Sequence, residues 1–333
     1  MARKQITLSD IAQACGTSSV TASKALSGKS GMSDELRNKI IATAERMGYV
    51  SQKSAPTGGI IGVLIPEKFM NPNGSFYWAL YNSLVQRLKK ENFSCVQESI
   101  TWEEEKKLVM PAFLGGPNIV GVISLGQLDR SYAKKLREKA RTLLLLDYYI
   151  DGVEADSIVS DGVLGGYRLT SYLIENGHTD IGFVGTKLAT SSIFDRYMGY
   201  VKAMLEHGLP LRDDRLIEDR TVSNELFEGI AFPKDMPTAF VCNCDETAFK
   251  VVRDLKARGF SVPDDISVVG YDNYLISEIS DPPITTINVD SKEMAELAVS
   301  VILERVRNSR LPIRTQVLNG KLVKKGSVKK LIK

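Results

Sequence analysis

Two short helix patterns separated by a glycine stand close together near the N-terminus, between residues 6 and 26. Thr7 and Asp10 have the spacing of a capping box, in which each side chain accepts a hydrogen bond from the other's backbone at a helix start. Apolar residues then recur at i, i+3, i+4 and i+7, and Gly16 ends the pattern, as a left-handed C-cap does. Ser18 can cap a second helix whose small apolar face packs against the first. This compact spacing predicts a helix-turn-helix.

A third helix pattern begins at Ser33, has acids in its first turn where the helix dipole favours them, and ends before Gly48. Residues 1–55 contain eight Lys or Arg and four Asp or Glu, a net charge of +4, whereas the whole chain carries +3. Positive charge is therefore concentrated in the three-helix unit, as expected where phosphates are contacted. We predict a DNA-binding domain over residues 1–50.

The composition of the chain indicates a soluble globular protein with more than one domain. It has 333 residues, of which 43% are hydrophobic and 25% are charged. No apolar stretch approaches the 18 residues or so of a membrane span, and the N-terminus has no apolar core of a signal peptide. The four cysteines are scattered and suggest no disulfide framework. We therefore expect a cytoplasmic protein with no membrane partner.

From residue 60 onward, short apolar runs alternate with amphipathic helix patterns. The apolar runs cover residues 60–65, 119–124, 142–147, 181–185, 239–243 and 266–272. The helix patterns cover residues 78–91, 163–176, 196–207, 246–258 and 291–307. Such alternation predicts parallel sheets covered by helices, an α/β fold in which ligands bind beyond the carboxyl ends of the strands.

The chain resembles the LacI/GalR family of bacterial transcription regulators. Its helix-turn-helix keeps the family's Thr7, Asp10, Ile11, Ala12, Ala14, Ser18, Thr21, Ser23, Lys24 and Leu26. The family's body motifs are matched at residues 172–185, 195–200, 262–273 and 283–287. The resemblance implies a three-helix helix-turn-helix head joined to a two-lobed Rossmann-like effector domain of the periplasmic-binding-protein type. It also implies a homodimer that reads a roughly palindromic operator in double-stranded DNA.

The resemblance implies a division of the chain into a head, a linker and two discontinuous lobes. The head covers residues 1–50, a short linker covers 51–59, and the effector-binding and dimerisation domain covers 60–333. Lobe 1 is expected at about 60–160 and 289–318, and lobe 2 at about 161–288 and 319–333.

DNA contacts are also implied by matched positions of the head. Ser19, Val20 and Lys24 occupy the base-reading positions, while Ser18, Thr21 and Ser23 would contact phosphates, with Thr7 at the start of the first helix. Lysine can donate to guanine, and an exposed valine can contact a thymine methyl group. Our hypothesis is that Val20 and Lys24 set operator preference.

The matched positions of the body place a small-molecule pocket between the lobes. The residues expected to face it are Phe76, Tyr77, Asp147, Tyr148, Arg196, Asn243, Asp245 and Asp272. Aromatic faces combined with carboxylate, amide and guanidinium groups suit a sugar or oligosaccharide, whose hydroxyl groups need buried donors and acceptors. Repression with this effector is the expected role, although induction, co-repression and activation all stay open.

Other functions find less support in the sequence. The Gly28-Lys29-Ser30 run lacks the earlier glycine of a P-loop, and no serine-hydrolase elbow or zinc-protease helix motif is present. We therefore expect no enzyme, no cofactor and no metal. Cys242 and Cys244 could make a thiol- or metal-sensing regulator, and a sugar-binding module without a regulatory role is a further alternative.

The linker departs from the family pattern. The family usually has a hinge helix here, whose leucine wedges into the minor groove of the operator. Residues 51–59 contain no leucine, and Pro56 with the following glycines opposes a helix. The sequence therefore predicts a flexible or extended connector that does not bend DNA through a hinge helix.

Overall fold

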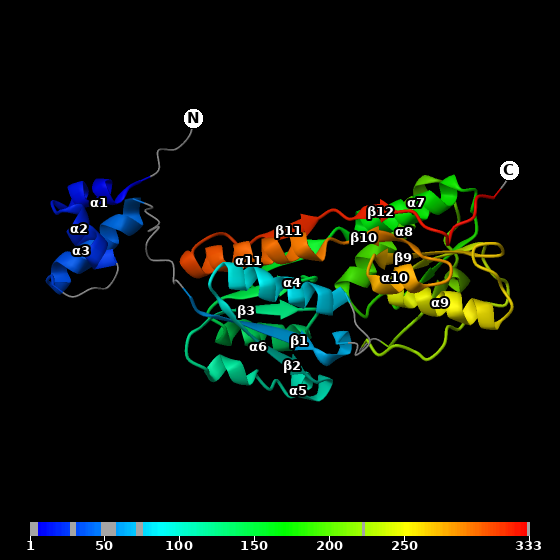
Figure 1. Ribbon diagram of the computed structural model, residues 1–333, viewed down its shortest axis with the longest axis horizontal. Coiled ribbons are helices and arrows are strands. Elements are labelled where there is room, and N and C mark those ends of the chain that lie inside the picture. Colours follow the sequence, from blue (N-terminus) through cyan, green and yellow to red (C-terminus); the bar gives the residue numbers. More distant parts are fainter. Residues whose placement is uncertain (1–5, 27–30, 48–57, 71–75, 222–223, 332–333) are drawn as a thin grey trace.

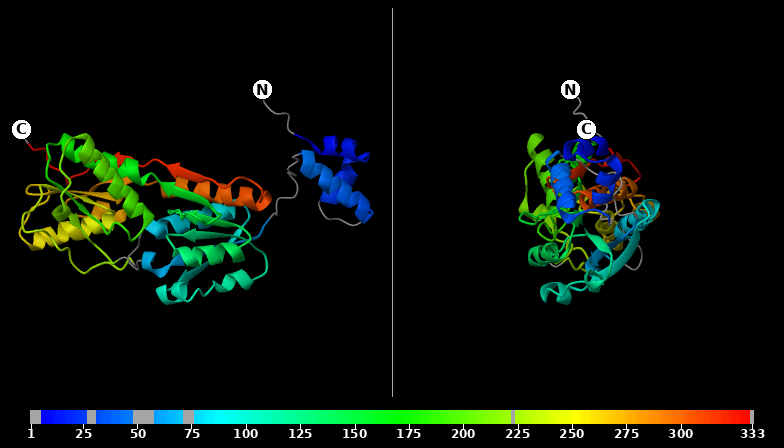
Figure 2. Two further views of the ribbon diagram at one scale, coloured as in Figure 1. Left: turned by 180° about the vertical axis from the view of Figure 1, so that it is seen from behind. Right: turned by 90° about the vertical axis from the view of Figure 1, so that its left-hand side faces the viewer.

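The computed structural model describes residues 6–26, 31–47, 58–70, 76–221 and 224–331. Figures 1 and 2 show a small three-helix unit that stands apart from two α/β lobes, which lie side by side. The predicted linker lies largely outside the described residues, at 51–57, so the absence of a hinge helix stays a prediction. No helix in the described ranges is long and apolar enough to cross a membrane.

The three helices of the head are α1 (Leu8–Cys15), α2 (Ser19–Leu26) and α3 (Asp34–Met47). Thr7 caps α1 in a capping box with Asp10, and Gly16 ends it at φ 69°. The Ser18 hydroxyl accepts a hydrogen bond from the backbone N–H of Thr21 at 3.1 Å and so caps α2. A core of Ile11, Ala12, Cys15, Ala22, Ala25, Ile40 and Ala44 joins the three helices. The predicted helix-turn-helix is confirmed.

Lobe 1 is built on a six-stranded parallel sheet in the order β11-β5-β4-β3-β1-β2. Its strands are β1 (Ile60–Pro66), β2 (Ser94–Ile100), β3 (Ile119–Leu125), β4 (Leu143–Leu146), β5 (Asp156–Ser160) and β11 (Thr315–Leu318). Its helices are η1 (Glu67–Phe69), α4 (Phe76–Lys90), α5 (Trp102–Lys106), η2 (Ala112–Gly115), α6 (Arg130–Lys139) and α11 (Ser291–Arg307). The central strands are apolar throughout because helices cover both faces of a parallel sheet.

Lobe 2 has a second six-stranded sheet in the order β12-β10-β9-β8-β6-β7, in which β12 alone runs antiparallel to its neighbour among the paired strands described. Its strands are β6 (Ile181–Val184), β7 (Leu216–Ile217), β8 (Ala239–Cys242), β9 (Ser267–Asp272), β10 (Thr285–Asn288) and β12 (Lys321–Val323). Its helices are α7 (Gly162–Glu175), α8 (Ser191–Glu206), η3 (Asp213–Arg215), α9 (Asp245–Ala257) and α10 (Leu275–Ile279).

The chain crosses between the two sheets three times. The crossings lie between β5 and α7 at residue 161, between β10 and α11 at residues 289–290, and between β11 and β12 at residues 319–320. The predicted α/β class is confirmed, and each apolar run expected as a strand contains one.

The sequence analysis missed β2, β5, β7, β10, β11 and β12 as strands, and α5, α6 and α10 as helices. The strands β2 and β7 lie at sheet edges, β7 has only two residues, and β11 and β12 are largely exposed. An edge strand has one partner and an open side, so it lacks the continuous apolar run of a central strand. A period-based search therefore overlooks it.

Candidate functional site

A cavity of about 300 Å³ lies between the two lobes. Lobe 1 lines it with residues 67–70, Phe76, Tyr77 and Asp147. Lobe 2 lines it with Thr190, Ser192, Ile193, Arg196, Arg220, Asn224, Glu225, Leu226, Asn243, Cys244, Glu246, Asp272 and Tyr274. Most of these residues follow the carboxyl ends of strands, the edge at which ligands bind in sheets of this kind. Six of the eight residues that the sequence analysis assigned to a pocket line this cavity.

Arg196 is the cationic centre of the cavity wall. Its Nη1 donates to the backbone oxygen of Asn243 at 2.7 Å, and its Nη2 lies 3.4 Å from Oδ1 of Asp272. The guanidinium carbon lies 3.8 Å from the ring centroid of Tyr271, which stacks against it. Burial opposes the charge of Arg196, but Asp272, Tyr271 and Asp147 together raise its pKa above the ordinary value. Arg196 is therefore a fixed positive charge, and its Nε has no hydrogen-bond partner among the described residues.

The position of Arg196 depends on close packing between α7 and α8. A Cβ atom on Gly166 would lie 2.2 Å from the backbone oxygen of Arg196, and one on Gly199 would lie 2.2 Å from the backbone oxygen of Val163. Only glycine permits this approach, since real Cβ contacts are never so short. The two glycines thus let α8 lie deep enough to bring Arg196 to the cavity.

Two carboxylates flank Arg196 from opposite lobes. Asp147 follows β4 and accepts a hydrogen bond from the Tyr77 hydroxyl at 2.8 Å, while Asp272 ends β9. Both have left-handed backbones, with φ 69° for Asp147 and φ 111° for Asp272, a conformation that is uncommon outside glycine and is often found at functional sites. Burial raises the pKa of each carboxyl, against the opposing influence of Arg196. The arrangement offers a ligand both hydrogen-bond donors and acceptors.

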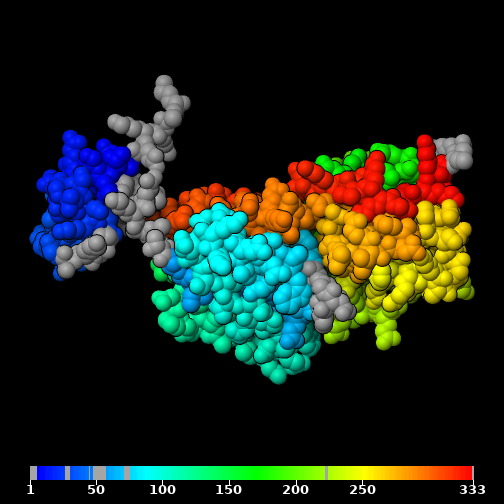
Figure 3. Space-filling view, in the orientation of Figure 1, coloured from blue at the N-terminus to red at the C-terminus, as the bar shows by residue number. Residues whose placement is uncertain are grey.

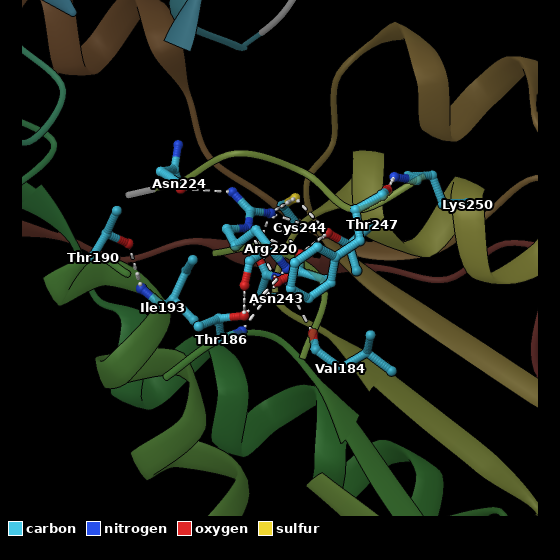
Figure 4. A network of polar contacts seen from close by, with 12 residues as sticks. Val184, Thr186, Thr190, Ile193, Arg220, Asn224, Asn243, Cys244, Thr247 and Lys250 are labelled. Carbon is cyan, nitrogen blue, oxygen red and sulfur yellow. Dashed lines mark hydrogen bonds and ion pairs between the residues drawn. The ribbon is translucent and has the colours of Figure 1, made fainter. Parts of the chain in front are cut away.

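Arg220 organises a second polar network at the cavity wall (Figure 4). Its Nη2 lies 2.7 Å from Oδ2 of Asp219 and 3.2 Å from Oδ1 of Asn243, and its Nη1 lies 3.0 Å from Oδ1 of Asn224. Burial acts to raise the pKa of the Asp219 carboxyl, but Arg220, Thr247 and Asn243 hold it below the ordinary value. The amide of Asn243 also donates to Asp219 at 2.7 Å. The Asn243 amide is therefore committed to this network, in which it helps to hold Arg220.

The expectation that Tyr148 and Asp245 face the pocket is wrong, since neither lines this cavity. Tyr148 is buried in the apolar cluster on the α6 side of the lobe 1 sheet, and its hydroxyl donates to Ser124 at 2.6 Å. It follows Asp147, whose left-handed backbone turns the chain after β4, so the two side chains leave the strand end in different directions. Asp245 begins α9 and accepts a hydrogen bond from the Thr286 hydroxyl at 2.6 Å, which turns its carboxyl toward β10.

The sequence analysis missed Arg220, Thr190, Ser192, Glu246 and Tyr274 as cavity residues. The polar residues that follow an apolar run were taken as candidates, but the run before Arg220 is the two-residue strand β7. A rule that accepts runs of only two apolar residues as strands would have identified Arg220. The same rule would also have selected many residues that do not line the cavity.

The buried carboxyl of Asp245 predicts an effect of pH on stability. Burial raises its pKa to about 7, from an ordinary value of 3.8, so the folded chain holds this proton more tightly than the unfolded chain. The tighter binding of this proton therefore stabilises the folded chain fully below about pH 4, and this contribution is lost as the pH rises through 7. We expect the free energy of unfolding of Asp245→Asn to increase relative to that of the parent between pH 4 and pH 8. The increase is about 1.4 kcal/mol for each unit by which folding raises the pKa of Asp245. Urea unfolding across this range measures the gain.

The exposed carboxyl of Asp264 provides a matched control for this measurement. Asp264→Asn should follow the parent closely at every pH. If the curves of Asp245→Asn and the parent stay parallel from pH 4 to pH 8, the carboxyl is ionised in the folded chain and the expectation is wrong.

The two thiols considered as sensors are unfavourable ligands for a metal. Cys242 is buried in β8, and burial raises its pKa well above the ordinary value. Cys244 lines the cavity, and burial raises its pKa to about 11, with Arg220 opposing that shift. Both groups are thiols near neutral pH, whereas metal binding and oxidation need the thiolate. The described part of the chain has no cluster of three or more His, Cys, Asp or Glu that could hold a metal ion.

The outer face of α2 carries the residues assigned to base reading. Val20 is 65% exposed, although valine is normally a core residue, and Ser19 and Lys24 are also exposed. The opposite face of α2 packs Ala22 and Ala25 into the head. Ser18 and Thr7 are exposed, while Thr21 and Ser23 are half-buried, so each of the assigned side chains has some surface that DNA could reach.

Comparison with known proteins agrees with both parts of the architecture. Residues 7–52 match the family described as bacterial regulatory proteins, lacI family, and residues 170–328 match the periplasmic binding protein-like domain. The chain belongs to the LacI family of bacterial regulatory proteins. The resemblance seen in the sequence is thereby confirmed, and this LacI-family protein is a DNA-binding transcriptional regulator.

Similar proteins align over nearly the whole LacI-family chain. The HTH-type transcriptional repressor PurR of Aliivibrio salmonicida is 25% identical over 335 residues, which cover 98% of this chain and 99% of the relative. The ribose operon repressor of Haemophilus influenzae is 26% identical over 97% of this chain and 98% of the relative.

Among solved structures, the complex of transcriptional regulator CelR with cellobiose has a TM-score of 0.70 and 20% identity, covering 97% of this chain and all of that chain. The lac repressor dimer bound to operator has a TM-score of 0.68 and 21% identity, covering 98% of this chain and all of that chain. These structures show the same fold.

Proposed function

We propose that this protein is a transcriptional repressor whose affinity for its operator is controlled by a sugar bound between the lobes. The observation that carries the proposal is the placement of Arg196 near Asp147 and Asp272, which come from different lobes, in a cavity between the lobes. The same chain carries, in its separate head, the exposed face of α2 that we assign to DNA reading. A ligand held by all three side chains would contact both lobes at once.

The chemistry of the cavity favours a neutral ligand rich in hydroxyl groups. Arg196 supplies donors, Asp147 and Asp272 supply acceptors, and the rings of Phe76, Tyr77 and Tyr274 supply apolar surface. A sugar hydroxyl both donates and accepts, and the C–H face of a sugar ring packs on an aromatic side chain. Two of the similar proteins, the ribose operon repressor and the CelR–cellobiose complex, have names that specify a sugar.

Regulation follows if the lobes can take two relative placements and the effector binds these two placements with different affinities. A ligand shifts an equilibrium only by its difference in affinity for the two states. Because Asp147 belongs to lobe 1 and Arg196 to lobe 2, a ligand that bridges them favours one relative placement of the lobes. That placement in turn sets the spacing of the two heads in a dimer, which must match the half-sites of the operator.

We further propose that the dimer forms through the face that carries α10. Leu275 and Ile279 lie one turn apart on this short helix and are 69% and 65% exposed. Figure 3 views this face, on which α10 (orange) and α4 (cyan) of the other lobe are both visible. Adjacent apolar side chains exposed in this way favour a protein partner over water. The lac repressor with the same fold is a dimer on its operator.

Replacing Ile279 with aspartate is expected to weaken the dimer at least tenfold, because a charge would be buried at the centre of the contact. Sedimentation velocity over a concentration series measures the change in dissociation constant. Leu205→Asp, at an α8 position that is 61% exposed, is the matched control and should leave the dimer unchanged. Equal behaviour of the two variants would place the dimer contact elsewhere.

The experiment that tests the function is a gel shift on the DNA upstream of the protein's own gene. Purified full-length protein is titrated with and without candidate sugars, and repression requires that operator affinity changes with one of them. Turnover of the sugar would indicate an enzyme instead, and sugar binding without DNA binding would indicate a module with no regulatory role. Calorimetric binding only of a purine or an amino acid would refute the sugar class.

A further inference from the structure

A second cavity, of about 390 Å³, opens between the lobes beside the first. We call it the outer cavity. Lobe 1 lines it with two loops at residues 127–130 and 149–151, and lobe 2 lines it with Lys187, Leu188, Thr190, Ser191 and Phe194. It is comparable in size to the cavity around Arg196, which we call the inner cavity, and of the lining residues the two share Thr190 alone.

The outer cavity adjoins the inner cavity. Thr190 lines both, and the wall between them is formed by Asp147, Tyr149, Val159, Ser160, Ser191, Ser192 and Asp195. Two hydrogen bonds cross from lobe to lobe at this wall. The Tyr149 hydroxyl donates to Oδ1 of Asp195 at 3.1 Å, and the backbone N–H of Ser191 donates to Oε1 of Gln127 at 2.7 Å. The wall is thus a contact between the lobes, which we call the seam, and its two hydrogen bonds break when the lobes move apart.

The lining of the outer cavity combines uncovered aromatic faces with balanced charge. Tyr149 is 43% exposed, Phe194 is 40% exposed, and Leu188 at the rim is 77% exposed. The charged lining residues are Asp129, Arg130, Asp151 and Lys187, two of each sign. This balance gives no net attraction for an anion or a cation, whereas uncovered rings among polar groups suit the apolar face and hydroxyl rim of a sugar.

We propose that the outer cavity is a second saccharide subsite, so that the effector is a disaccharide or longer rather than a single sugar. One ring lies in the inner cavity against Arg196, and the next passes Thr190 and packs on Tyr149 and Phe194. The wall has no room for a water molecule as it stands, so the ligand replaces the hydrogen bond between Tyr149 and Asp195 where it crosses. This inference rests on the proposed function, because it extends the sugar site of the inner cavity.

The two cavities together also explain how ligand length bears on regulation. A single ring in the inner cavity contacts both lobes but leaves the hydrogen bonds of the seam intact. A longer ligand contacts both lobes and opens the seam, so it has the larger difference in affinity between lobe placements and the larger effect on operator binding.

The test is calorimetry on the full-length protein with matched saccharide series. The probes are glucose, maltose and maltotriose, then glucose, cellobiose and cellotriose, then xylose, xylobiose and xylotriose. We expect one series in which the disaccharide or trisaccharide binds at least tenfold tighter than the monosaccharide. Phe194→Ala should lower the affinity for the longer ligand at least tenfold and change the affinity for the monosaccharide less than twofold. Tyr149→Phe keeps the ring and loses the seam bond, so it should bind the longer ligand no more weakly than the parent.

Leu205→Ala, an exposed apolar position of the same helix as Phe194, is the control and should behave as the parent. Monosaccharide binding that gains nothing from further rings, or a loss in Phe194→Ala that is equal for short and long ligands, would overturn the outer subsite and leave the proposed function standing. If no saccharide of any length binds, the proposed sugar effector fails and the outer subsite fails with it.

Discussion

Replacing Arg196 with lysine is expected to lower effector affinity about 100-fold, equivalent to about 2.7 kcal/mol. Lysine keeps the positive charge beside Asp272 but loses the planar fork that reaches two acceptors at once and the stacking on Tyr271. It also loses Nε, a buried donor that has no hydrogen-bond partner among the described residues. Calorimetry with the effector found in the sugar screen measures the loss.

The choice of lysine limits the damage to the fold. Removing the charge altogether would leave the buried carboxyl of Asp272 without its partner, at a cost of about 3–5 kcal/mol for breaking a buried pair. The expected outcome is a melting curve of Arg196→Lys close to that of the parent, with operator binding intact but no longer changed by the effector. Arg212→Lys, at an exposed ion pair with Asp214 outside the cavity, should bind effector within twofold of the parent. If the two variants bind effector alike, Arg196 does not contact the ligand.

Replacing Val20 and Lys24 together with alanine is expected to lower affinity for the parent's operator about 100-fold. Each good contact with a base edge contributes about 1–3 kcal/mol of discrimination, and the two side chains are exposed on the same helix. The loss should be largest for the selected operator and small for random DNA, because phosphate contacts of the head remain. Selection of binding sites from a random library, followed by gel shifts at one salt concentration, measures both affinities.

Lys39→Ala is the matched control, since Lys39 is an exposed lysine on α3 and not on α2. It removes one positive charge and should weaken binding to all DNA alike. A double variant at Val20 and Lys24 that selects the same operator as the parent, with the same ratio over random DNA, would show that other residues read the bases.

The helix-turn-helix could be predicted closely because its determinants are local. The capping box of Thr7 with Asp10 spans three residues, and Gly16 and Ser18 end one helix and begin the next within the same turn. The central strands could be predicted equally well, because a strand that is buried on both faces requires an apolar run in the sequence. Edge strands such as β7 carry no such requirement and were missed.

The cavity could be predicted only in part, because it is assembled from segments far apart in the chain. Tyr77 and Asp147, which are hydrogen-bonded to each other, are separated by 70 residues, and Arg196 reaches Asp272 over 76. The rule that ligand-binding polar residues follow the carboxyl ends of strands selected segments that do line the cavity. It could not decide which of two adjacent side chains faces the cavity, and so it accepted Tyr148 along with Asp147.

The sequence by itself determined the three-helix head, the α/β class and the family, because caps, helix faces and buried strands depend on residues close together along the chain. The tertiary structure decided which polar groups meet. It turned Tyr148 and Asp245 away, brought in Arg220 from the segment after a two-residue strand, and placed Tyr149 across the seam from Asp195. A shift of one residue at a strand end reverses the direction of a side chain, and only the packing of the two lobes selects the direction.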